Sequence, residues 1–176
     1  MTLPHSSITG RRLAHLLAAL LLLGACGSGA SGGGTSVTGV PFTASDGQRT
    51  TIADFHGTPV VVNLWATWCT PCVAEMPAFD QVAGTQAGVA IIGVNVGDTA
   101  AAATAFAADL GVTYPQYTDP DGQLSTALHA TGYPATAFFS ADGTLLELHQ
   151  GALTADELRA AISRHFAETT TEGTST

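Results

Sequence analysis

The most constraining feature of this sequence is a Cys-Thr-Pro-Cys motif that follows closely on a short apolar run. The run, Val60 to Trp65, is almost continuously apolar and rich in β-branched side chains, which is typical of a central strand buried on both faces. Cys69 and Cys72 follow it, and a helical pattern continues from them to about Ala83. The sequence therefore predicts a buried strand that passes into a helix at the two cysteines.

The predicted position of Cys69 at a helix N-terminus indicates a reactive thiol. Free N–H groups and the helix dipole favour an anion there, so the Cys69 thiol is expected to ionise more readily than a free cysteine. Cys72 lies one turn later, close enough to form a disulfide with Cys69 and to resolve a mixed disulfide. Pro71 suits a first helical turn because it needs no N–H partner. Trp65 and Trp68 are expected to shield the pair and contact substrate.

Other uses of two such cysteines fit the sequence less well. A structural zinc site needs four ligands, and the sequence has neither a second motif of this kind nor a closely spaced histidine pair. Attachment of a c-type haem needs a histidine where this chain has Val73. A purely structural disulfide across so short a loop would stabilise the fold little. Redox chemistry is the favoured interpretation.

Strand and helix patterns alternate along the chain and then end in a hairpin, which predicts a mixed α/β sheet covered by helices. Met76 and Phe79 are expected in the core, and Gly111 is expected to end a helix. Strands are expected at 42–44, 49–52, 60–65, 89–96, 137–140 and 145–150, and helices at 69–83, 99–110, 124–130 and 154–166.

The N-terminus has the pattern of an export signal. Arg11 and Arg12 precede an apolar stretch, residues 13–23, that is shorter than the roughly 20 residues of a membrane-spanning helix. The stretch ends Leu23-Gly24-Ala25-Cys26, which resembles the cleavage box of bacterial lipoproteins. This resemblance implies cleavage before Cys26 and a lipid on its sulfur. An ordinary signal cut near Ala30 and an uncut anchor are the alternatives.

These patterns divide the chain into four parts. We expect a signal peptide at 1–25, the lipidated cysteine and a flexible Gly/Ser tether at 26–36, one folded domain at 37–168, and a disordered tail at 169–176.

Composition excludes several partners. The chain has a formal charge of −9 and only five basic residues, so nucleic acid and a polybasic membrane contact are not expected. Four scattered histidines are interpreted as surface or loop residues: His56, His129, His149 and His165.

The run from Val60 to Cys72 resembles the thioredoxin superfamily. Within that superfamily it is similar to the TlpA/ResA-like, membrane-tethered thiol–disulfide oxidoreductases of the redoxin family, and the likeness covers roughly residues 40–167. It implies a thioredoxin-like mixed central sheet flanked by helices, with a helix-containing insertion after the second core strand. The matching segments are Asp54-Phe-His-Gly57, Trp68-Cys-Thr-Pro-Cys72, Ile91-Ile-Gly-Val-Asn95, the insertion at 99–119, and Thr131-Gly-Tyr-Pro-Ala-Thr136.

The last of these segments occupies the place of the family's cis-proline loop. The resemblance implies that Pro134 is cis and that Tyr133 presents its backbone to a bound peptide, with Trp68, Thr70 and Pro71 also contacting substrate. A plain loop proline is the alternative.

One departure from cytosolic thioredoxins concerns proton handling. Those proteins carry a buried Asp where this chain has Asn63, and a lysine that this chain lacks. Glu75, one turn after Cys72, is therefore the candidate for tuning the pKa values of Cys69 and Cys72. The alternative is a solvated glutamate that complements the helix dipole.

Together these features predict an extracytoplasmic thiol–disulfide oxidoreductase, lipid-anchored to the outer face of the bacterial cytoplasmic membrane and needing no organic cofactor or metal. Its partners would be exported protein thiols or disulfides, including apocytochromes, and a membrane redox partner that resets the pair. We expect a monomer with a slight preference for reduction, in cytochrome c maturation or disulfide quality control. An oxidase of the same fold is the first alternative.

Two further alternatives have weaker sequence support. A peroxiredoxin-like peroxidase usually needs a Thr-x-x-Cys motif with a supporting arginine, and Thr70 follows Cys69 instead. A metal-carrying module needs a Cys-x-x-x-Cys motif and a downstream histidine, and the spacing here is one residue short.

Overall fold

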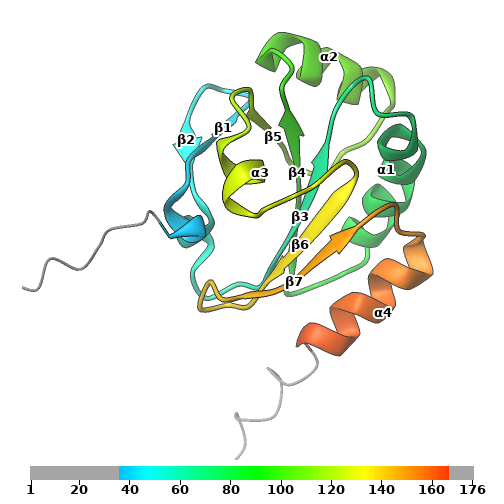
Figure 1. Cartoon of the computed structure of the whole chain (residues 1–176). Helices are drawn as coiled ribbons and strands as arrows, with labels where there is room; N and C mark the ends of the chain where they lie inside the picture. Colours follow the sequence, from blue (N-terminus) through cyan, green and yellow to red (C-terminus); the bar gives the residue numbers. More distant parts are fainter. Residues whose placement is uncertain (1–35, 167–176) are drawn as a thin grey trace, which may run out of the picture. The chain divides into compact units, whose positions relative to one another are not determined.

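The computed structural model describes residues 36–166, and the predicted signal peptide, Cys26 and the C-terminal tail lie outside this range. The sheet has seven strands in the order β2-β1-β5-β4-β3-β6-β7 (Figure 1). The strands are β1 (Phe42–Ala44), β2 (Arg49–Thr50), β3 (Val60–Trp65), β4 (Ala90–Val96), β5 (Gln116–Asp119), β6 (Ala135–Phe139) and β7 (Leu145–Gln150). The helices are α1 (Thr70–Ala83), α2 (Ala100–Asp109), α3 (Gln123–Ala127) and α4 (Ala155–Phe166), with short 3₁₀ helices at Val37–Gly39 and Ile52–Phe55.

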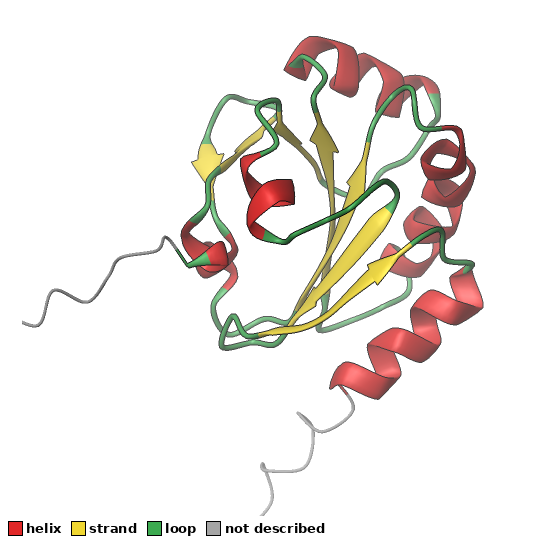
Figure 2. Cartoon of the chain, in the orientation of Figure 1, coloured by secondary structure: helices red, strands yellow, loops and turns green. Residues whose placement is uncertain are grey.

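Strand β3 lies at the centre of this mixed sheet. It pairs in parallel with β4 and antiparallel with β6, and every one of its residues is buried. Its alternating side chains enter two separate cores, because successive residues of a strand point to opposite faces. Val61 and Trp65 pack with α1, α2 and α4, whereas Val62 and Leu64 pack with α3 and the N-terminal segment. Figure 2 shows helices on both faces of the sheet. The predicted α/β sheet flanked by helices is confirmed.

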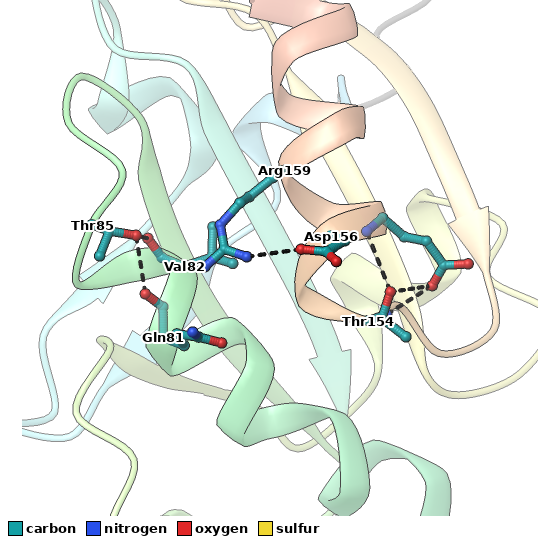
Figure 3. Close-up of polar contacts among 7 residues, drawn as sticks. Gln81, Val82, Thr85, Thr154, Asp156 and Arg159 are labelled. Carbon is teal, nitrogen blue, oxygen red and sulfur yellow. Dashed lines mark hydrogen bonds and ion pairs between the residues drawn. The ribbon is translucent and has the colours of Figure 1, made fainter.

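Helix α4 begins with a capping box. The Thr154 hydroxyl accepts a hydrogen bond from the Glu157 N–H, and the Glu157 carboxylate accepts from the Thr154 N–H. Figure 3 shows this cap, the Asp156–Arg159 ion pair of 3.2 Å, and Thr85 donating to main-chain oxygens at the end of α1. Helices α1 and α4 pack together on one face of the sheet.

Several element boundaries differ from the sequence prediction. β2 ends at Thr50, because Asp54 caps a 3₁₀ helix that begins at Ile52. β6 begins at Ala135, where it pairs with Leu64 of β3. The other helices and strands differ by a few residues at their ends: α2 spans Ala100–Asp109, α3 spans Gln123–Ala127, and β4 starts at Ala90.

The predicted insertion contains a strand that the sequence analysis missed. After α2, Gln116–Asp119 forms β5, which joins β4 in parallel and β1 antiparallel. Its four residues are polar apart from Tyr117 and lack the apolar alternation that marks a strand. Within residues 36–166, no helix is long and apolar enough to cross a bilayer.

Candidate active site

The two cysteines lie where β3 passes into α1, as predicted. Cys69 is the N-cap of α1 and Cys72 lies in its first turn, and the two sulfurs form a disulfide. The Cys72 N–H donates to the Cys69 sulfur at 3.3 Å. Cys69 is 5% exposed and Cys72 is fully buried. An incoming sulfur therefore reaches Cys69 first, and the same N–H would stabilise a Cys69 thiolate after reduction.

An aspartate at the end of β4 holds the loop before the cysteines. The Asp98 carboxylate accepts hydrogen bonds from the Thr67 N–H, the Thr67 hydroxyl and the Asn95 side chain, each at 2.9 Å. Partial burial opposes ionisation of Asp98, but these donors outweigh it and lower its pKa. The sequence analysis did not identify Asp98, whose only signal was its position just after a predicted buried strand.

The Tyr133–Pro134 peptide bond is cis, as the resemblance implied. Pro134 is buried directly before β6, and the Tyr133 ring contacts the Trp68 ring edge-on with centroids 5.9 Å apart. The Tyr133 hydroxyl also shares a hydrogen bond of 2.7 Å with Ser125 of α3. The cis-proline loop and the cysteine loop thus meet through two aromatic side chains.

Trp65 and Trp68 have different environments. Trp68 is 67% exposed and is available to a partner, together with the exposed Thr70 and Pro71. Trp65 is fully buried, and its Nε1 group donates to Gln116 at 2.9 Å. The expectation that Trp65 contacts substrate is therefore wrong, because as the last residue of β3 it points into the core below α1 and α2.

Glu75 lies in α1 one turn after Cys72 and is only 4% exposed, so it is not a solvated first-turn glutamate. Its Oε1 atom accepts from the Asn63 amide at 2.7 Å, and its Oε2 atom accepts from the Leu153 N–H at 2.9 Å. Burial raises the pKa of Glu75 to about 7, although the hydrogen bonds from Leu153 and Asn63 oppose the rise. A carboxyl group with this pKa gains and loses a proton near neutral pH.

The remaining residues singled out from the sequence lie away from the cysteines or in the core. Met76 and Phe79 are fully buried in α1, as predicted. His165 is not a loop residue, because it lies on α4 with its ring 2.6 Å from Glu147 of β7. His149 lies within β7, near the same glutamate. Among residues 36–166, no group of three His, Cys, Asp or Glu residues is placed to hold a metal ion.

A family model described as Redoxin matches residues 33–162. This chain belongs to the redoxin family. It is 33% identical over 115 residues to the thiol-disulfide oxidoreductase ResA of Oceanobacillus iheyensis, a match that covers 64% of this redoxin and 60% of that protein. It is 37% identical over 122 residues to the thiol:disulfide interchange protein DsbE of Pseudomonas fluorescens biotype C, covering 65% and 67% of the two chains.

A solved structure supports the same placement. A secreted disulfide oxidoreductase of Mycobacterium tuberculosis, homologous to E. coli DsbE, is 26% identical to this redoxin and matches it with a TM-score of 0.65. The match covers 73% of this chain and 97% of the other. The fold of this redoxin is therefore thioredoxin-like, as the sequence resemblance implied.

The site of this redoxin combines three chemical capabilities. Cys69 keeps a small exposed fraction of 5%, Cys72 is fully buried, and Glu75 supplies a carboxyl group of near-neutral pKa one helical turn after Cys72. The arrangement suits an exchange in which one cysteine captures a partner and the other releases it.

Proposed function

We propose that this redoxin is an extracytoplasmic thiol–disulfide oxidoreductase that exchanges disulfides with exported proteins. The observation that carries the proposal is the Cys69–Cys72 disulfide at the start of α1, in which Cys69 is 5% exposed and Cys72 is fully buried. The names of the ResA, DsbE and M. tuberculosis relatives support the same reaction class. Trp68, Thr70, Pro71 and the backbone of Tyr133 beside cis Pro134 would contact the substrate chain.

In the proposed reaction, the reduced protein acts through two displacements. The Cys69 thiolate attacks one sulfur of a substrate disulfide, and the other substrate sulfur leaves as a thiolate that takes up a proton. Cys72 then loses its proton and attacks Cys69, which expels the second substrate sulfur. That sulfur also leaves as a thiolate and takes up a proton. The protein ends as the Cys69–Cys72 disulfide and the substrate as a dithiol, so two electrons pass to the substrate. One of the two protons it gains balances the proton lost by Cys72, and the other comes from solvent, because Cys69 reacts as a thiolate. Reversal installs a disulfide.

Glu75 would handle the proton of the buried cysteine. Cys72 has no exposed surface, so its thiol cannot lose a proton directly to bulk water. Glu75 lies one turn further along α1 and has a pKa of about 7, which lets its carboxylate accept a proton near neutral pH. The same carboxylate would influence the pKa values of both cysteines through its charge.

The direction of exchange is proposed as reduction. The Thr70-Pro71 dipeptide lacks the histidine found between the cysteines of strong oxidants, which favours a reducing pair. Apocytochromes and other exported proteins with accessible disulfides are the proposed substrates, in cytochrome c maturation or disulfide quality control. A disulfide-forming role remains the alternative, because the same two steps run in either direction.

We further propose that the protein is a monomer held at the outer face of the cytoplasmic membrane by a lipid on Cys26. The lipoprotein-like box before Cys26 and the Gly/Ser tether after it support this placement. A membrane redox partner would then return the cysteine pair to its starting state. Mass spectrometry of the protein isolated from membranes tests the anchor, because lipidation joins a diacylglyceryl group to the Cys26 sulfur through a thioether bond and adds its mass.

Equilibration in glutathione buffers, followed by tryptophan fluorescence, tests the reaction and its direction. A reduction potential of about −270 mV for the Cys69–Cys72 pair matches a thioredoxin-like reductant, whereas a potential of about −120 mV matches a strong oxidant. The Cys72→Ser variant should accumulate mixed disulfides with its substrates, because it captures them and cannot release them. The proposal fails if Cys69 in the reduced protein reacts with iodoacetamide at pH 7 no faster than a model thiol.

A further inference from the structure

A chain of side-chain hydrogen bonds continues beyond Glu75 and ends on a tyrosine. The Tyr114 hydroxyl donates to Oδ1 of Asn63 at 3.1 Å, and Nδ2 of the same amide donates to Glu75 at 2.7 Å. Asn63 is fully buried in the middle of β3, flanked by Gly93 of β4 and Thr136 of β6. The amide therefore joins a hydroxyl on one side to a carboxyl group on the other.

The position of Tyr114 is fixed on the same helix that carries Glu75. Oδ1 of Asp80 in α1 accepts hydrogen bonds from the N–H groups of Thr113 and Tyr114. The Tyr114 ring lies against Phe79 of α1 with centroids 6.3 Å apart. Backbone and ring are thus both anchored to α1, and the hydroxyl reaches β3 in a set direction.

A buried asparagine amide can adopt two orientations that differ by a half turn. In the observed one, its N–H points at Glu75 and its oxygen receives the Tyr114 proton. In the reverse one, two oxygens would face each other at Glu75, an arrangement that requires a protonated carboxyl group. The Tyr114 hydroxyl would then face N–H donors and lose the acceptor for its own proton, which is unfavourable in a buried site.

We propose that Tyr114 is a positioning residue whose hydroxyl fixes the Asn63 amide as a hydrogen-bond donor to Glu75. With phenylalanine at position 114, the hydroxyl that favours the observed orientation is lost. The amide can then turn to accept a proton from neutral Glu75, which stabilises the neutral form. Any effect of Tyr114 on disulfide exchange rests on the proposed function of Glu75. The effect of Tyr114 on the orientation of the Asn63 amide is independent of that function.

Several titratable or hydrogen-bonding groups surround the Glu75 carboxyl group. Burial raises the pKa of Tyr114, a side-chain hydrogen bond with Gln116 opposes the rise, and the charges of Glu75 and Asp80 add to it, so Tyr114 stays protonated. Asp80 is one to two turns along α1, and Cys72 is one turn back on the same helix. The Leu153 N–H adds a donor from the segment before α4. In the oxidised protein the cysteines do not titrate, so the titration of Glu75 can be followed separately from theirs.

Carboxyl ¹³C NMR of the oxidised protein tests the proposal, with the Glu75 signal assigned by its loss in Glu75→Gln. In Tyr114→Phe, we expect the midpoint of the Glu75 titration to rise by about one pH unit, the size of one hydrogen bond to a charged group. Tyr117→Phe is the matched control, because it removes the hydroxyl of a tyrosine that packs on Phe42 in the other core. An unchanged or lower midpoint in Tyr114→Phe overturns the proposal.

A measurement on the unaltered protein guards against a folding defect in the variant. The side-chain N–H signals of Asn63 should shift with the same midpoint as Glu75, because they donate to its carboxylate. If these signals do not respond to pH between 5 and 9, the proposal is wrong whatever the variant does.

Thiol reactivity of the reduced protein separates this proposal from the proposed function. If Glu75 controls the cysteines, the pH profile of Cys69 alkylation should move upward in Tyr114→Phe and should not move when the same change is made in a Glu75→Gln background. A shifted Glu75 titration with an unshifted alkylation profile would uphold the role of Tyr114 and overturn that of Glu75 in exchange.

Discussion

The Nε1 group of Trp65 donates a hydrogen bond of 2.9 Å to Oε1 of Gln116, two strands away in the sheet. The Gln116 side chain reaches Trp65 over Gly93 of β4, where a Cβ atom would lie 2.2 Å from that same oxygen. Nε2 of Gln116 also donates to the main-chain oxygen of Tyr114 at 3.1 Å. The missing side chain at position 93 therefore permits a link between the strand before the cysteines and the segment that carries Tyr114.

Gly93→Ala should disrupt this link and destabilise the protein by about 2 kcal/mol, since Gln116 must move and leave the buried Trp65 N–H without its acceptor. Urea denaturation followed by Trp fluorescence measures the loss. Gly84→Ala is the control, because its Cβ would meet only ordinary contacts at 3.5 Å or more in a helical conformation. Equal stability of the Gly93 and Gly84 variants would contradict the prediction.

Glu75 should make stability depend on pH. Its pKa rises from 4.5 to about 7 on folding, so the folded state holds the proton more tightly than the unfolded state. The contribution of Glu75 to the free energy of unfolding should therefore be greatest below about pH 4.5. It should fall as the pH rises to about 7 and stay low above that pH. The full change is about 3 kcal/mol.

Urea unfolding of the oxidised protein at pH 5 and pH 8 tests this dependence. Glu75→Gln should remove most of the difference between the two pH values, whereas Asp156→Asn, which changes an exposed carboxylate on α4, should leave it intact. A wild-type protein that is as stable at pH 8 as at pH 5 would show that Glu75 keeps an ordinary pKa.

Asp98 should be a principal support of the cysteine loop. Asp98→Ala removes the acceptor for the Thr67 N–H, the Thr67 hydroxyl and the Asn95 amide, so we expect a loss of about 2–3 kcal/mol in unfolding free energy. Thr67→Val removes one of the three bonds and should cost about 1 kcal/mol. Calorimetry of both variants gives the comparison, and a smaller loss in Asp98→Ala than in Thr67→Val would refute it.

Trp68 should matter for substrate and not for folding. Because its side chain is 67% exposed, Trp68→Ala should change the melting temperature little. It should lower kcat/KM for a disulfide-bonded peptide by about tenfold, the effect of one lost aromatic contact. Leu146→Ala, an exposed apolar residue on β7, is the control and should leave kcat/KM unchanged. A similar loss in both variants would show that Trp68 makes no specific contact.

Local sequence patterns predicted the part of the site that is contiguous in the chain. The β-branched run before Cys69 and the helical pattern after it placed both sulfurs correctly, because burial of a central strand and N-capping of a helix leave clear local signals. The cis bond before Pro134 was anticipated from a resemblance and not from residue chemistry.

The remaining part of the site depends on contacts between distant segments. Tyr114 and Gln116 lie 51 positions from their hydrogen-bond partners in β3. Strand β5 lacks the apolar alternation from which a strand can be predicted. The burial of Trp65 also followed from this arrangement, since a tryptophan beside a reactive motif looks the same in sequence whether it faces solvent or the core.

The unequal access of the two sulfurs imposes a sequence of events on any encounter. In the reduced protein, a bulky partner or an alkylating reagent would meet Cys69 first, because Cys72 is fully buried in the first turn of α1. Conjugates would therefore form at Cys69, and the buried Cys72 would be protected from oxidation and alkylation until it releases them. In the proposed exchange, any covalent link to a partner would therefore be made at Cys69 and broken by Cys72, whichever way the electrons pass.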